Sequence, residues 1–158
     1  MSMTIFFKDN SYLPIVESNR HMTIPVNLYN VDETIVDRKY FILDTGAEVM
    51  TISRETVKIY GFDKITPKET TIVGFGGEEQ VHVIIIPKME ILNISFYDIP
   101  VIVPINETNT IEVIGLNVLR YLDYYIDNTA DKMYIKKTYS PKPYKPDRAP
   151  KEVLYNEE

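Results

Sequence analysis

The chain has 158 residues, with 17 Lys and Arg against 23 Asp and Glu, which gives a formal net charge of −6. The charge is spread without a basic stripe, so a protein that tracks nucleic-acid phosphates or a basic helix that lies on a membrane is disfavoured. The chain has no cysteine and only two histidines, far apart, which excludes a disulfide framework, a thiol nucleophile and cysteine-ligated metals. No apolar run approaches the roughly 20 residues of a membrane span. We therefore predict no metal and no cofactor, and we expect a soluble, cytoplasmic protein that binds neither nucleic acid nor membrane.

The length and the apolar composition predict one mostly β domain. Ile and Val total 35 residues, whereas Leu and Ala total 11. Because β-branched side chains favour pleated strands and Leu and Ala favour helices, the composition indicates an all-β fold. We assign residues 1–20 to an N-terminal arm or added hairpin, 21–137 to the domain, and 138–158 to a tail. Four prolines between positions 141 and 150 predict that this tail is extended.

In chain order, alternating apolar residues from position 22 predict a first strand, and a second runs directly into an Asp-Thr-Gly triplet at 44–46. A short helix should follow, because Ser53 suits an N-cap and Gly61 suits a left-handed position just past the helix end. A glycine-rich segment at 74–79 should form the tip of a hairpin. A second short helix is expected at 116–122. The expected strands cover residues 22–29, 39–43, 70–73, 81–86, 89–97, 99–103, 111–114, a segment ending at 127, and 132–136.

The candidate for catalysis is Asp44. The chain carries no G-x-S-x-G elbow, no phosphate-binding P-loop and no dinucleotide fingerprint, so a nucleophile or cofactor of those kinds is not indicated. Asp44 directly follows the apolar run 40–43 and so should lie at the rim of the core. The alternative is that Asp44 only starts a turn, since Asp, Thr and Gly are common turn residues.

Three motifs in order favour the catalytic interpretation. The segment 41–53, FILDTGAEVMTIS, resembles the active-site loop of retropepsin-like aspartic proteases. Thirty residues after Asp44, GFGG at 74–77 is similar to the tip of their flap hairpin. VIGLNVL at 113–119 resembles the segment that opens their second helix and packs behind the active-site loop. The resemblance extends over roughly residues 23–136. Its pattern is near that of bacterial aspartyl-protease domains and of the retroviral-like domain of ubiquitin-shuttle proteins.

The resemblance implies an acid-protease barrel with a flap hairpin and one or two short helices, one lobe per chain, and an aspartic endopeptidase acting on peptide or protein substrates. Two aspartates must share one proton in this chemistry, and the triplet occurs once, so a homodimer is expected. Glu48 and Leu116 depart from the retroviral pattern, in which an Asp and an Arg stand at these positions and form an ion pair. The implied catalytic residues are Asp44, Thr45 and Gly46, and the implied substrate-binding residues are Ala47, Glu48, Gly74, Phe75, Gly76 and Gly77.

Two other functions stay open at this point. The same dimeric groove could bind an extended peptide by strand addition without cleaving it, as a catalytically silent binding or dimerisation module. Alternatively, the protease could be silent until the arm or the tail moves.

Overall fold

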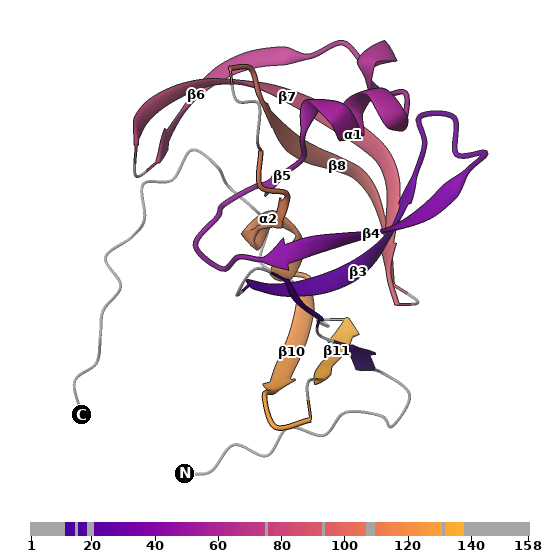
Figure 1. The fold of residues 1–158 in the computed structure, drawn as a ribbon. Coiled ribbons are helices and arrows are strands. Elements are labelled where there is room, and N and C mark those ends of the chain that lie inside the picture. The colour runs from indigo at the N-terminus through magenta and orange to yellow at the C-terminus, as the bar shows by residue number, and fades with distance from the viewer. Residues whose placement is uncertain are drawn as a thin grey trace.

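The computed structural model describes residues 12–14, 16–18, 21–74, 76–92, 94–106, 110–130 and 132–137. These residues form one eight-stranded sheet, one three-stranded sheet and a few short helical segments (Figure 1). The predicted all-β class is therefore confirmed. The tail at 138–158 and the first eleven residues of the arm lie outside the described residues.

The eight-stranded sheet curves until its strands pair a second time. Besides its neighbours in the sheet, β3 pairs with β7 through Asn27 opposite Glu90 and Leu28 opposite Met89, which closes part of the sheet into a barrel. Two of its pairings, β4 with β9 and β5 with β8, are parallel, and the others are antiparallel. The strand order is β2 (Val16–Ser18), β3 (His21–Tyr29), β4 (Val36–Leu43), β9 (Val113–Ile114), β5 (Met50–Thr51), β8 (Ile94–Pro104), β7 (Gly77–Ile91) and β6 (Lys68–Gly74).

The main hydrophobic core is formed by alternate residues of these strands together with the helical segments. Ile24, Val26 and Leu28 of β3 are completely buried and belong to one cluster with Phe41 of β4 and Phe62. Burial of each such side chain contributes about 1.5–3 kcal/mol to folding. The apolar residues whose alternation predicted β3 are thus the ones that face the core.

The first helix agrees with its sequence signals. Helix α1 (Arg54–Ile59) overlaps β7 in the view of Figure 1, and the Ser53 side chain accepts a hydrogen bond from the backbone N–H of Thr56. Gly61 follows with φ +73°, in the left-handed region that glycine was expected to supply, and leads into the 3₁₀ helix η1 (Phe62–Lys64).

Strand boundaries between residues 81 and 103 and the end of the second helix were placed wrongly. The strands expected at 81–86 and 99–103 are parts of the longer strands β7 (Gly77–Ile91) and β8 (Ile94–Pro104), which continue through the expected gaps at 87–88 and at 98. The single strand predicted at 89–97 is interrupted, because β7 ends at Ile91, Leu92 turns with φ +54°, and β8 begins at Ile94. The apolar alternation continues on both sides of the turn and conceals it. The second helix, α2 (Leu116–Leu119), is shorter than the predicted 116–122, because Leu122 already begins β10.

The three-stranded sheet lies below the barrel in Figure 1 and has the order β1-β11-β10. β10 (Leu122–Asp127) and β11 (Lys132–Lys137) form a hairpin, and β1 (Tyr12–Pro14) pairs with β11. Since β2 pairs with β3, the described part of the segment assigned to an arm contributes strands to both sheets.

Candidate active site

Asp44 lies immediately after β4, partly buried, at the start of a tight loop. Its backbone N–H donates to the carbonyl oxygen of Ile114 in β9, at 3.1 Å. Its Oδ1 atom accepts from the backbone N–H of Gly46, at 2.9 Å, and a Cβ on Gly46 would lie only 3.2 Å from that oxygen. Thr45 and Gly46 are exposed. The loop therefore presents the Asp44 carboxylate in one orientation with its neighbours open to solvent.

The second half of this loop is fixed by the start of α2. The carbonyl oxygen of Ala47 accepts from the backbone N–H of Leu116 at 2.8 Å, and that of Glu48 accepts from the N–H of Asn117 at 2.9 Å. These two N–H groups belong to the first turn of a helix, where they have no partner within the helix. The Glu48 side chain is exposed, and the retroviral Asp–Arg ion pair has no counterpart here because Leu116 is apolar.

Gly115 permits this close packing. A Cβ at this position would lie 2.7 Å from the carbonyl oxygen of Ala47 and 2.9 Å from the backbone nitrogen of Val49. Both atoms belong to the backbone and cannot move without shifting the chain, so a residue larger than glycine fits here only if the loop is displaced. The segment 113–119 thus lies directly behind the Asp44 loop, as the sequence pattern indicated.

Asn117 is a positioning residue to which the sequence analysis assigned no role. The residue is 9% exposed, its Oδ1 accepts from the backbone N–H of Met50 at 2.9 Å, and its Nδ2 donates to the carbonyl oxygen of Pro100 at 2.9 Å. One amide therefore joins α2 to the end of the loop and to β8. The available signal was a polar residue inside the apolar run 113–119.

The strand register places a row of side chains, apolar except for Thr51, on the face of the sheet where Asp44 lies. Residues opposite one another on paired strands project from the same face of a sheet, and Asp44 follows Ile42 by two positions, which returns it to that face. Ile102 and Val113 are buried but do not belong to the main core cluster, which agrees with their place on the other face of the sheet. The row consists of Ile42, Val113, Thr51, Ile102 and Val83, each opposite the next.

The predicted flap is a hairpin between β6 and β7. Gly74 pairs with Gly77, which has φ +103°, and a Cβ on Gly74, Gly76 or Gly77 would meet nothing within 4 Å. Phe75, predicted to contact substrate, lies outside the described residues. The hairpin tip and the Asp44 loop both project to the left in Figure 1. Among the described residues, no hydrogen bond is formed between the hairpin tip and the Asp44 loop.

Other kinds of site find less support in the part of the chain that the structure describes. No group of three or more His, Asp or Glu side chains there could hold a metal ion, and no helix there is long and apolar enough to cross a membrane. Pockets of about 270 and 440 Å³ lie beside α1 and η1, and Asp44 lines neither of them.

Comparison with known proteins agrees with this geometry. The family model described as gag-polyprotein putative aspartyl protease matches residues 34–121, which include the Asp44 loop, β6, β7 and α2. No curated protein matches the chain. A solved structure of a retropepsin-like aspartic protease from Rickettsia conorii is similar in fold, with 21% sequence identity, a TM-score of 0.55, and coverage of 79% of this chain and 98% of that chain. The predicted retropepsin-like fold is therefore confirmed, and the chain belongs to the retropepsin-like family of gag-polyprotein putative aspartyl proteases.

Proposed function

We propose that the chain is an aspartic endopeptidase that works as a homodimer, with Asp44 of each copy in one active site. The observation that carries the proposal is the Asp44 loop itself. Its carboxylate directly follows β4, the backbone of its loop is hydrogen-bonded to β9 and α2, and a row of side chains that is apolar except for Thr51 lies beside it on the same face of the sheet. Such an arrangement suits a reacting carboxylate next to a surface for apolar substrate side chains.

Two copies are required because one carboxylate cannot do both parts of the reaction. When two aspartates lie close together they cannot both ionise, so one keeps a proton and the other acts as a base. The base removes a proton from a water molecule, and the water oxygen bonds to the scissile carbonyl carbon. The C–N bond then breaks, the nitrogen takes up a proton, and an acid and an amine leave.

The neighbouring residues have defined places in this proposal. Thr45 joins the two loops across the two-fold axis, and Gly46 lets the substrate backbone approach. Ala47 and Glu48 lie along the bound peptide, and the Glu48 carboxylate can accept from its backbone N–H groups. The flap residues Gly74, Phe75, Gly76 and Gly77 cover the peptide, and the open space around the described glycines would allow the hairpin to move.

The three-stranded sheet offers a surface through which two copies can meet. β10 is at one edge of this sheet, and edge strands readily pair with a strand of another chain. Pairing of β10 with the partner's β10 would extend the sheet across a two-fold axis. Light scattering at micromolar concentration should then give about twice the chain mass of 18.4 kDa, and a monomer throughout that range would contradict the proposal.

The decisive variant is Asp44→Asn. Asparagine keeps an oxygen that can accept from Gly46 N–H, so the loop should survive, but the amide can neither act as the base nor share a proton. Asp63→Asn makes the same chemical change at an exposed position in η1 and serves as the control. Turnover of a diverse peptide library is followed by mass spectrometry, and peptide affinity is measured by calorimetry.

We expect wild type and Asp63→Asn to cleave, and Asp44→Asn to bind the same peptides without cleaving them. If wild type cleaves nothing yet binds peptides as well as Asp44→Asn does, the groove is a receptor and not a protease site. If Asp44→Asn cleaves as fast as wild type, Asp44 is a turn residue and the catalytic assignment is wrong.

A further inference from the structure

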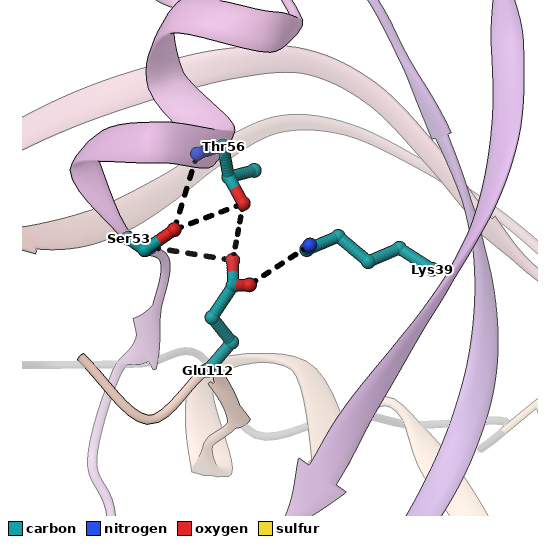
Figure 2. Close-up of polar contacts among 4 residues, drawn as sticks. All are labelled: Lys39, Ser53, Thr56 and Glu112. Atoms are coloured by element: carbon teal, nitrogen blue, oxygen red, sulfur yellow. Dashed lines mark hydrogen bonds and ion pairs between the residues drawn. The ribbon is translucent and has the colours of Figure 1, made fainter. Parts of the chain in front are cut away.

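A group of polar side chains between β4 and the start of α1 is centred on Glu112. One carboxylate oxygen of Glu112 lies 2.9 Å from the Nζ atom of Lys39. The other accepts from the hydroxyl of Thr56 at 2.6 Å and from the backbone N–H of Ser53 at 3.3 Å. Figure 2 shows the carboxylate between Lys39 on one side and the first turn of α1 on the other. A single side chain therefore joins β4 to α1.

These partners lie on the two chain segments that enter and leave the Asp44 loop. Lys39 belongs to β4, which ends at Leu43, directly before Asp44. Ser53 follows β5, the strand that leaves the loop. The backbone of Glu112 contributes as well, because its carbonyl oxygen accepts from the N–H of Ile42 at 3.0 Å. Glu112 thus fixes the spacing between the entry and the exit of the loop.

The environment makes these contacts stronger than those of an ordinary surface ion pair. Thr56 is 1% exposed, and the side chains of Glu112 and Lys39 are 16% and 27% exposed. Exposed pairs are weak because water screens them and two side chains lose freedom. A shielded carboxylate that accepts from a hydroxyl and an N–H, and pairs with an ammonium group, forms stronger hydrogen bonds.

We propose that Glu112 is a positioning residue for the catalytic loop: its carboxylate sets the distance between β4 and α1 and so holds Asp44 where it can react. The part of this inference that concerns cleavage rests on the proposed protease activity. The part that concerns the loop does not, since it refers only to hydrogen bonds within one chain.

Three variants test the contacts of Glu112 with β4 and with α1 separately. Glu112→Gln keeps an oxygen for Thr56 and Ser53 but turns an NH₂ group towards Lys39, so it removes the β4 connection. Lys39→Met removes the same connection from the other side, with a chain of similar length. Thr56→Val removes the hydroxyl and leaves the shape, so it weakens the α1 connection.

Glu90→Gln is a matched control at a distance from the loop. Glu90 is another half-buried carboxylate, 24% exposed, that accepts from the Tyr29 hydroxyl at 3.0 Å and pairs with Lys88 at 3.5 Å. It lies where β7 pairs with β3 and β8 rather than beside the loop. Any general effect of neutralising a shielded carboxylate should appear in this variant as well.

The first measurement is native-state hydrogen exchange by NMR. The N–H groups of Leu116 and Asn117 report on the loop because they donate to Ala47 and Glu48. We expect Glu112→Gln to lower their protection about tenfold relative to Glu90→Gln, as expected when a hydrogen bond to a charged group is lost. Lys39→Met should act in the same way, and combining it with Glu112→Gln should add little, because both remove one interaction.

The second measurement is peptide cleavage. A displaced catalytic group lowers kcat more than it changes substrate binding. We therefore expect Glu112→Gln to lower kcat about tenfold with KM within about twofold of wild type, and Thr56→Val to shift kcat in the same direction. Glu90→Gln should change neither parameter.

The outcomes separate this inference from the proposed function. If Leu116 and Asn117 lose no more protection in Glu112→Gln than in Glu90→Gln, Glu112 is a general stabilising residue and the inference fails. A wild type that cleaves no peptide would remove the proposed function, while the exchange data would still decide whether Glu112 holds the loop. Lowered protection in Glu112→Gln with an unchanged kcat would overturn the catalytic part of the inference alone.

Discussion

Replacement of Asn117 by alanine tests how strongly the Asp44 loop depends on one buried amide. The change removes the acceptor of the Met50 N–H and the donor to the Pro100 carbonyl. We expect Asn117→Ala to destabilise the protein and to loosen the end of the loop.

The loss of stability depends on whether water can replace the lost hydrogen-bond partners of the Met50 N–H and the Pro100 carbonyl. Met50 is completely buried, so water cannot replace the lost partner of its N–H, and an unsatisfied buried group costs about 1–3 kcal/mol. Pro100 is exposed, so its carbonyl can bind water, and that loss should cost about 0.5–1 kcal/mol. The expected total is about 1.5–4 kcal/mol, which for a domain of this size lowers Tm by roughly 3–16 °C.

Urea denaturation measures this loss, with Asn30→Ala as the control. The Asn30 side chain also makes two hydrogen bonds, to the backbone N–H of Ile35 and to the hydroxyl of Thr34, but both are exposed to solvent. Asn30→Ala should therefore cost less than about 1 kcal/mol. An unchanged m-value in both variants would show that the difference arises in stability and not in the compactness of the unfolded chain.

The reasoning is refuted if the two variants lose the same stability. Equal losses would mean that burial of the Met50 N–H does not set the cost, and that α2 holds the loop without the amide of Asn117. A loss of more than about 4 kcal/mol would point to collapse of the packing around α2 rather than to two hydrogen bonds.

Three further predictions concern other parts of the molecule. Gly115→Ala should lower the free energy of unfolding by about 3 kcal/mol in urea denaturation, because its Cβ would lie 2.7 Å from the Ala47 carbonyl oxygen. In Gly76→Ala, where a Cβ would meet nothing within 4 Å, the free energy of unfolding should stay within about 0.5 kcal/mol of wild type, and equal losses in the two variants would contradict this packing. Peptide cleavage should be bell-shaped with pH and highest in acid, because the two Asp44 carboxylates must share one proton, and a steady rise in rate through pH 9 would exclude that mechanism. The hydrogen bond to Glu90 raises the pKa of Tyr29 above its ordinary value of 10.0, so the bond made by neutral Tyr29 stabilises the fold below pH 10, and this contribution is lost as the pH rises through the raised pKa. NMR titration of labelled tyrosine should give a pKa of Tyr29 closer to 10.0 in Glu90→Gln, and an unchanged pKa would exclude Glu90 as the cause.

The sequence predicted the local features of the fold well because their causes are local. Alternation along β3, the Ser53 cap and the left-handed Gly61 each depend on residues within a few positions of one another. The break between β7 and β8 was missed because the apolar pattern runs through Leu92, and only the backbone turn distinguishes two strands from one long strand.

The Asp44 loop is held in place by contacts between segments far apart in the chain, and no local sequence pattern predicts such contacts. Asn117 reaches Met50 across 67 positions, and Glu112 reaches Thr56 across 56. Both residues are polar interruptions in apolar runs, which marks them as unusual but names no partner. The roles of Asp44, Thr45, Gly46 and the flap glycines came from the family resemblance and remain predictions.

The hydrogen bonds of the Asp44 loop determine from which side a substrate or a second copy can approach it. The Asp44 N–H and the carbonyl oxygens of Ala47 and Glu48 are all used on the side of β9 and α2, and Gly115 leaves no space there. A peptide or a partner loop on that side would have to break these bonds. The face that holds Ile42 and Val113 carries apolar side chains next to the carboxylate and requires no such loss. In the proposed dimer, the active site would therefore form on this face, where a peptide can bind while the hydrogen bonds of the Asp44 loop to β9 and α2 stay in place.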